Sequence, residues 1–169
     1  DASVAAVEKA GVVIAVINPH VPHTYGDGLI PTDRIHVFVE DDTPLETVHF
    51  APPNAVEAAI GKHCASLIED GATLQMGIGA IPNAVLAQLS GHKNLGIHTE
   101  MFADGVIDLV EKGVINGANK AIDRGRMVAT FLLGSKRLYD YTHRNERVLM
   151  KDVGYTNDPF IIAKNPKAT

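Results

Sequence analysis

A carboxylate and a glycine turn, each placed just after an apolar segment, are the residues best suited to chemistry. Gly77-Ile78-Gly79 follows the apolar segment that begins at Leu74, and Pro82 is predicted to open a helix, where its missing N–H costs nothing. A glycine turn before a helix gathers backbone N–H groups that suit a phosphate or another anion. Glu100 follows a second short strand. Ligands of open parallel sheets lie at the carboxyl ends of the strands, so we expect Glu100 and the turn to meet at one edge.

The same residues also have purely structural interpretations. Glu100 can be a surface carboxylate, or a charge favoured by the dipole of a helix that opens near Asp104. The two glycines can simply permit positive φ and close packing. Asn157 or Asp158, directly before Pro159, is typical of a helix N-cap. Residue types alone therefore leave these alternatives open.

Two other kinds of site fit the pattern less well. His98-Thr99-Glu100 has the H-x-E form of zinc deaminases, which also need P-C-x-x-C downstream, but the single cysteine, Cys64, lies upstream. A Rossmann nucleotide-binding turn requires G-x-G-x-x-G, and Pro82 occupies the third glycine position. A nucleotide-binding module and a non-catalytic α/β module remain alternatives of another class.

Composition restricts the partners and the compartment. The 169 residues are 46% hydrophobic and 21% charged with a net charge of −5, which indicates a globular core and argues against a nucleic-acid surface. One cysteine excludes an internal disulfide and favours a reducing, cytoplasmic compartment. No apolar run approaches the ~20 residues that span a membrane.

Strands that alternate with helices of about ten residues predict a mostly parallel, doubly wound α/β sheet with helices on both faces. Asn54 is predicted to cap a helix with an apolar stripe of Val56, Ile60, His63 and Leu67. The β–α units that follow are 72–76 with 82–89, 95–98 with 104–111, and 127–132 with 135–145, before a last strand at 148–151.

The chain before residue 54 is organised differently. Val12–Ile17 is a continuous apolar run, as in a strand covered on both faces, and Ile35–Val39 is predicted to form a second strand. A proline-rich, acidic segment at 40–53 follows and indicates a domain boundary. Two strands cannot bury a core alone, so we expect residues 1–46 to have an exposed apolar face.

Four segments together resemble the acetyl-CoA hydrolase/transferase family, with the 4-hydroxybutyrate (butyrate-type) CoA-transferases as the nearest branch. They read LQMGIGAIPNAV, LGIHTEMFADGVIDLVEKGVING, GSKRLYDY and YTNDPFIIAKN. The resemblance implies a NagB/RpiA-like fold that occurs twice in the whole enzyme. Residues 1–46 would end the first domain, 47–53 would link, and 54–169 would begin the second, catalytic domain. Family members extend further at both ends, so we expect an internal piece of a full-length enzyme.

The resemblance also implies a reaction. Glu100 aligns with the catalytic glutamate, whose carboxylate attacks an acyl-CoA thioester and becomes a glutamyl-CoA thioester. The substrates would be an acyl-CoA and a short-chain carboxylate, namely 4-hydroxybutyrate, butyrate or acetate. Coenzyme A would be a substrate, with no further cofactor and no metal. Hydrolysis of acetyl-CoA is the alternative within the family.

Other residues receive roles only through the resemblance. Gly77, Ile78 and Gly79 would contact CoA, Gln75 would hydrogen-bond the substrate carbonyl or the pantetheine, and Asn157 would orient the carboxylate or the acyl group. Tyr25-Gly26-Asp27 matches a family loop without a known role. The family's glycine-rich oxyanion motif is not found in this sequence, so we expect the isolated chain to be inactive. The full-length enzyme would be a homodimer or tetramer.

Overall fold

A parallel sheet forms the centre of the computed structural model, which describes residues 2–165 and 167–169. Strands β4 (Thr73–Leu74) and β5 (Gly96–Ile97) pair in parallel, as do β7 (Met127–Ala129) and β9 (Val148–Met150). A parallel bridge between His98 and Val128 joins the two pairs. The parallel α/β class predicted from the sequence is therefore confirmed.

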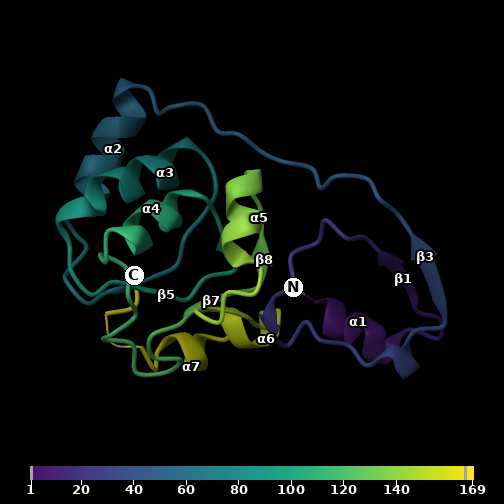
Figure 1. The fold of residues 1–169 in the computed structure, drawn as a ribbon. Helices are drawn as coiled ribbons and strands as arrows, with labels where there is room; N and C mark the ends of the chain where they lie inside the picture. Colours follow the sequence, from purple (N-terminus) through teal and green to yellow (C-terminus); the bar gives the residue numbers. More distant parts are fainter. Residues whose placement is uncertain (1, 166) are drawn as a thin grey trace.

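Short helices connect the strands and cover the sheet on both sides. Helices α3 (Ala80–Gln88) and α4 (Gly105–Glu111) lie on one side in Figure 1, and α6 (Val153–Thr156) and α7 (Pro159–Ile162) lie on the other. Helix α5 (Lys136–Thr142) precedes β9, and a 3₁₀ turn, η2 (Leu89–Gly91), follows α3. The buried core between these layers includes Leu74, Leu89, Ile97, Phe102, Ile107, Met127 and Leu138.

The predicted strand at 127–132 is interrupted at Thr130. Its second part, β8 (Phe131–Leu132), pairs in parallel with β6 (Met101–Phe102), a strand that the sequence pattern does not reveal. The N–H groups of Thr130 and Phe131 both donate to the backbone oxygen of Glu100, at 2.9 and 3.0 Å. The interruption therefore lets Thr130 and Phe131 hold the Glu100 segment through two hydrogen bonds.

Helix α2 (Ala55–Ala65) begins where predicted but packs through a different face. Asn54 and Glu57 form a full capping box. The predicted apolar stripe is wrong, because Val56 is 68% and Leu67 80% exposed. Gly61 and Ala65 are buried instead, and a Cβ on Gly61 would lie 2.7 Å from the Cβ of Ala84 on α3. Small residues let the two helices approach closely.

The N-terminal elements lie apart from the main sheet (Figure 1). Helix α1 (Ser3–Lys9) and the 3₁₀ turn η1 (Thr32–Arg34) accompany β1 (Ile14–Ile17) and β3 (Val37–Glu40), which pair with each other in parallel as a two-stranded sheet. The expected exposed apolar face is confirmed, since large apolar side chains on both strands are open to solvent, namely those of Ile14, Val16, Ile17, Val37, Phe38 and Val39.

Strand β2 (Tyr25–Gly26) joins this N-terminal part to the main sheet by pairing in parallel with β9. Next to it, Asp27 accepts hydrogen bonds from the Lys151 ammonium at 3.0 Å and from the N–H of Asp152 at 3.2 Å. The segment Tyr25-Gly26-Asp27, which has no role at the level of sequence, thus holds two parts of the chain together. The domain bounds 1–46, 47–53 and 54–169 stay predictions.

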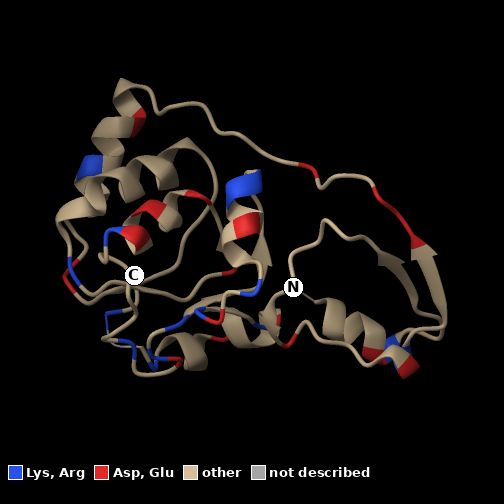
Figure 2. Ribbon diagram, viewed as in Figure 1, with Lys and Arg blue, Asp and Glu red and all other residues tan. Residues whose placement is uncertain are grey.

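Charged residues are spread over the molecule, with acidic and basic positions interspersed along the ribbon (Figure 2). None of the helices within the described residues is both long and apolar enough to cross a membrane.

Candidate active site

Glu100 and the glycine turn follow neighbouring parallel strands, so they lie at the same edge of the sheet, as predicted. Thr99 connects the two segments. Its buried hydroxyl accepts a hydrogen bond from the N–H of Met76 at 2.9 Å, and the Met76 carbonyl lies 3.0 Å from the same oxygen. Met76 directly precedes Gly77 and Thr99 directly precedes Glu100, so this contact fixes the spacing of the two functional segments.

The side chain of Asn157 reaches Glu100. Its Nδ2 donates a hydrogen bond to Oε2 of Glu100 at 2.8 Å. Asp158 is the residue that caps α7, because its carboxylate accepts the N–H of Phe160 at 2.7 Å. The sequence left Asn157 and Asp158 as alternative caps. The structure separates their roles and leaves the Asn157 amide free to contact the half-buried glutamate.

The glycine turn presents an open surface at the start of α3. Gly79 has a φ of +114°, which favours glycine, and a Cβ there would meet no atom within 4 Å. Within the part of the chain that the structure describes, no side chain caps α3, whose first N–H groups lack intrahelical acceptors. The helix begins at Ala80, two residues before the predicted start, so Pro82 is its third residue and still removes no helical hydrogen bond. Ile78, the middle residue of the turn, is exposed.

Gln75 directly follows β4 but lies beside a different set of residues. It lines a cavity of about 130 Å³ together with Thr73, His98 and Asn165. Its backbone N–H donates to the carbonyl of Thr169 at 2.9 Å. Within the described residues its amide makes no hydrogen bond to Glu100, so its role toward a substrate stays a prediction.

Sequence reasoning assigned no supporting role to the buried polar residues behind the hydrogen bond between Asn157 and Glu100. Thr156 is 1% exposed, and its hydroxyl lies 3.0 Å from Oδ1 of Asn157 and 2.5 Å from the hydroxyl of Thr130. His98 is buried, and its Nε2 lies 3.1 Å from the Thr156 carbonyl. Burial lowers the pKa of His98, so the neutral ring donates from Nε2 to that carbonyl. The only signal in the sequence is position: Thr156 directly precedes Asn157, and His98 lies two residues before Glu100.

Lys120 stabilises the end of β5, the strand that leads to Glu100. The side chain is buried, and its ammonium donates to the carbonyls of Ile97 and Arg126, each at 2.9 Å. Burial lowers the pKa of Lys120 to about 8. A lysine that the sequence does not single out thus holds the end of β5 against the loop before β7.

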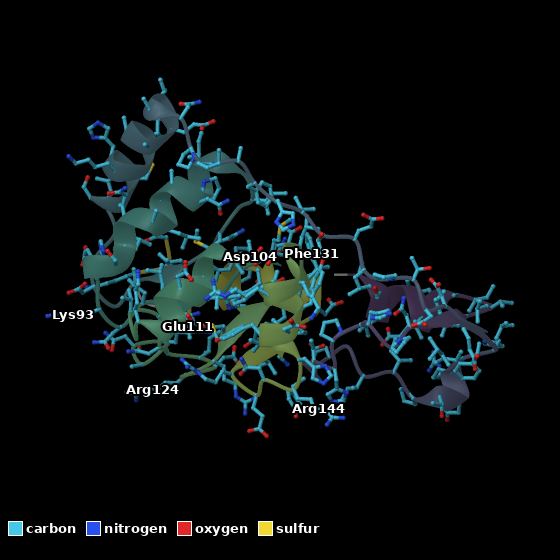
Figure 3. The ribbon with its side chains drawn as sticks, turned by 45° about the horizontal axis from the view of Figure 1, so that its top comes forward. Lys93, Asp104, Glu111, Arg124, Phe131 and Arg144 are labelled. Carbon is cyan, nitrogen blue, oxygen red and sulfur yellow. The ribbon has the colours of Figure 1, made fainter. Side chains whose placement is uncertain are left out.

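Asp104 occupies the N-cap position of α4, but its side chain makes no capping hydrogen bond to the helix. Its carboxylate accepts the N–H of Ser135 at 2.8 Å and also the Ser135 hydroxyl, at the start of α5. Figure 3 places Asp104 near Phe131, while Lys93, Arg124 and Arg144 lie at the periphery. Asp104 therefore joins two helices beside the site. Among the described residues, no group of three or more His, Cys, Asp or Glu is placed to hold a metal ion.

Comparison with solved structures defines the class of this fold. A crystal structure of 4-hydroxybutyrate CoA-transferase from Porphyromonas gingivalis superposes with a TM-score of 0.92 at 45% identity, covering 97% of this chain and 42% of that one. The structure of RipA from Yersinia pestis gives a TM-score of 0.94 at 35% identity, covering 99% and 39%. The fold is that of the CoA-transferases.

Sequence comparison gives the family. Residues 134–169 match the acetyl-CoA hydrolase/transferase C-terminal domain. The 4-hydroxybutyrate coenzyme A transferase of Clostridium kluyveri is 51% identical over 95% of this chain. The chain belongs to the acetyl-CoA hydrolase/transferase family, and it spans 37% of the length of that curated relative.

Proposed function

We propose that this chain is part of a CoA-transferase that moves coenzyme A from an acyl-CoA to a short-chain carboxylate through a glutamyl-CoA thioester on Glu100. The 2.8 Å hydrogen bond from Asn157 to the Glu100 carboxylate carries this proposal, because it holds a nucleophile in place at the open edge of the sheet. Relatives named as transferases of this kind support the reaction class.

The first half-reaction uses the carboxylate directly. One oxygen of Glu100 attacks the thioester carbonyl, the C–S bond breaks, and CoA thiolate leaves a mixed anhydride behind. The thiolate then attacks the γ-carbonyl of Glu100, and the substrate's carboxylate departs. A second carboxylate repeats both steps in reverse, so no net proton is taken up or released. A carboxylate is a weak nucleophile toward a thioester, so binding energy from the long CoA molecule must lower the barrier.

The glycine turn is the proposed contact for CoA. Backbone N–H groups at Gly77, Ile78 and Gly79 and the uncapped start of α3 offer donors next to Glu100. Coenzyme A is thus a substrate, and the mechanism needs no further cofactor. Asn157 would orient the glutamate through its amide, and Gln75 would act on the substrate only if its side chain turned out of its cavity.

Three proposals concern the whole protein. The acceptor is 4-hydroxybutyrate, butyrate or acetate, in line with relatives named for 4-hydroxybutyrate and for butyryl-CoA and acetate. Hydrolysis of the glutamyl thioester is the second candidate activity, since a relative 27% identical is named acetyl-CoA hydrolase. A cytoplasmic homodimer or tetramer remains the expected form.

Trapping the intermediate tests the proposal. Full-length protein incubated with acyl-CoA and then borohydride should lose activity, and peptide mass mapping should find one side chain reduced to an alcohol at Glu100. Glu100→Gln should abolish both transfer and labelling, because an amide cannot attack the thioester. Glu100→Asp withdraws the carboxylate by over ~1 Å and should lose about 10²-fold in rate.

Glu111→Gln provides a matched control. Glu111 is a surface carboxylate that pairs with Arg137 at 3.0 Å, so its loss should leave labelling and transfer intact. A label on Asp104 or Asp108, or near-normal turnover by the Glu100→Gln protein, would show that Glu100 is not the nucleophile.

A further inference from the structure

A line of hydrogen bonds runs from the sheet to Glu100 through Thr156. The hydroxyls of Thr130 and Thr156 are 2.5 Å apart, Thr156 Oγ1 is 3.0 Å from Asn157 Oδ1, and Asn157 Nδ2 is 2.8 Å from Glu100 Oε2. Thr156 is completely buried, whereas Asn157 is exposed. The last rigid group before the solvent-facing amide is therefore the Thr156 side chain.

The number of protons on each group determines which group donates in each of these hydrogen bonds. Glu100 as a carboxylate only accepts, so Asn157 must present its NH₂ group to Glu100 and its oxygen to Thr156. A threonine hydroxyl has one proton, and Thr156 must give it to Asn157 Oδ1, since two facing oxygens without a proton would repel. Thr156 Oγ1 then accepts from the Thr130 hydroxyl, whose alternative acceptor, the carbonyl of Lys151, lies farther away at 3.1 Å. Each group in turn is a donor toward Glu100.

The backbone of Thr156 is held as firmly as its hydroxyl. The neutral His98 ring donates to the Thr156 carbonyl at 3.1 Å, and the Thr156 N–H donates to the carbonyl of Asp152 at 3.1 Å. The alternative acceptor for the hydroxyl, the Asp152 carbonyl at 3.5 Å, lies at the limit of a hydrogen bond. An ordinary helix-stabilising role thus fits the geometry less well than a contact to Asn157.

We infer that Thr156 is a positioning residue that selects the rotamer and the amide orientation of Asn157 and thereby holds Glu100 for attack. The inference rests on the proposed role of Glu100 as nucleophile. Without the Thr156 hydroxyl, the exposed Asn157 side chain can rotate or flip, and its oxygen would then face the carboxylate. The glutamate would spend less time in the attacking position, although every atom that touches the substrate is still present.

Removing the hydroxyl while keeping the side-chain shape is the direct test. In the full-length protein, Thr156→Val should lower kcat about tenfold or more, since displacements near 1 Å can cost about 10²-fold. KM for acyl-CoA should change little. Thr156→Ser restores the hydroxyl and should recover most of kcat. Thr142→Val is the matched control, because among the described residues that buried hydroxyl bonds only to the carbonyls of Leu138 and Tyr139 on α5.

A double variant separates positioning from stability. If Thr156 acts through Asn157, Thr156→Val should have little further effect on kcat in the Asn157→Ala background. Equal losses in both backgrounds, no rescue by serine, or a similar loss from Thr142→Val would overturn the inference. Borohydride labelling distinguishes the two levels: a wild-type label away from Glu100 refutes the proposed nucleophile, whereas a label at Glu100 with full activity in Thr156→Val refutes only the positioning role.

Discussion

Asn157 is the only side chain within the described residues that hydrogen-bonds the Glu100 carboxylate, which makes its chemistry easy to test. Asn157→Ala removes the donor and should reduce kcat/KM. Asn157→Asp should be more damaging, because it removes the donor and also places a second negative charge within about 3 Å of the first. Steady-state kinetics of both variants check this order, and an aspartate variant more active than the alanine variant would contradict it.

Lys120 should give the protein a distinctive pH dependence. Its pKa is lowered from 10.5 to about 8 by burial, so between these values the folded protein has lost a proton that the unfolded chain still binds. The free energy of unfolding should therefore rise with pH across this window, by on the order of 3 kcal/mol in total. Below pH 8 the lysine is charged in both states and its contribution is constant.

Urea unfolding of wild type and Lys120→Met between pH 7 and pH 10 measures this effect. The wild-type value minus the variant value should increase as the pH rises, since only the wild type carries the group. A difference that stays constant would mean that the ammonium is not held in a poorly solvated site.

A site residue was predictable where the order of the strands determines its position. It was not predictable where the direction of a single side-chain atom decides its role. Glu100 follows an apolar strand, and the parallel sheet then fixes where its side chain must emerge. Asn157 and Asp158 are equivalent in a cap pattern, and only the direction of one amide separates them. Thr156 carries no signal beyond its place before Asn157, because its role depends on a contact with the side-chain oxygen of Asn157 that forms only after the chain has folded.

At the scale of elements, the contact between α2 and α3 depends on a missing side chain. A Cβ on Gly61 would lie 2.7 Å from both the Cβ and the backbone carbon of Ala84, so Gly61→Ala must push the helices apart. Alanine gains about 1 kcal/mol of helix propensity, but overpacking costs about 1–3 kcal/mol. We expect a net loss of stability. Gly91→Ala, whose Cβ meets nothing within 4 Å, is the control.

Denaturant midpoints of the two variants provide the measurement. Gly61→Ala should unfold at a lower urea concentration than wild type, and Gly91→Ala should unfold close to it. A Gly61→Ala protein more stable than wild type would mean that the helices separate without loss.

Strand–helix alternation predicted the main sheet well because each buried strand reads as an apolar run. It missed β2 and β6, which have two residues each and therefore no periodicity. It also assigned α2 the wrong buried face. Apolar spacing identifies a stripe, but the packing surface of α2 is chosen by Gly61, whose small size permits an approach that larger residues forbid.

At the scale of the whole molecule, we predict that the 169-residue chain alone does not transfer CoA. It spans 37% of the length of the Clostridium relative, and it lacks the glycine-rich motif expected to stabilise the oxyanion. Loss of even one oxyanion donor typically costs about 10²–10³ in rate. Turnover by the purified chain, compared with a full-length homologue under the same conditions, measures this. Comparable rates would refute the prediction.

The pairing of β2 with β9 has a consequence for synthesis on the ribosome. Asp27 and its partner Lys151 are 124 residues apart in the chain. At elongation rates of about 5–20 residues per second, roughly 6–25 s pass between the synthesis of β2 and the synthesis of its partner strand β9. During that interval β2 has no partner strand, so its backbone N–H and C=O groups are open to pairing with another chain. The nascent protein is therefore most prone to aggregate before β9 emerges, and slower translation would lengthen that period.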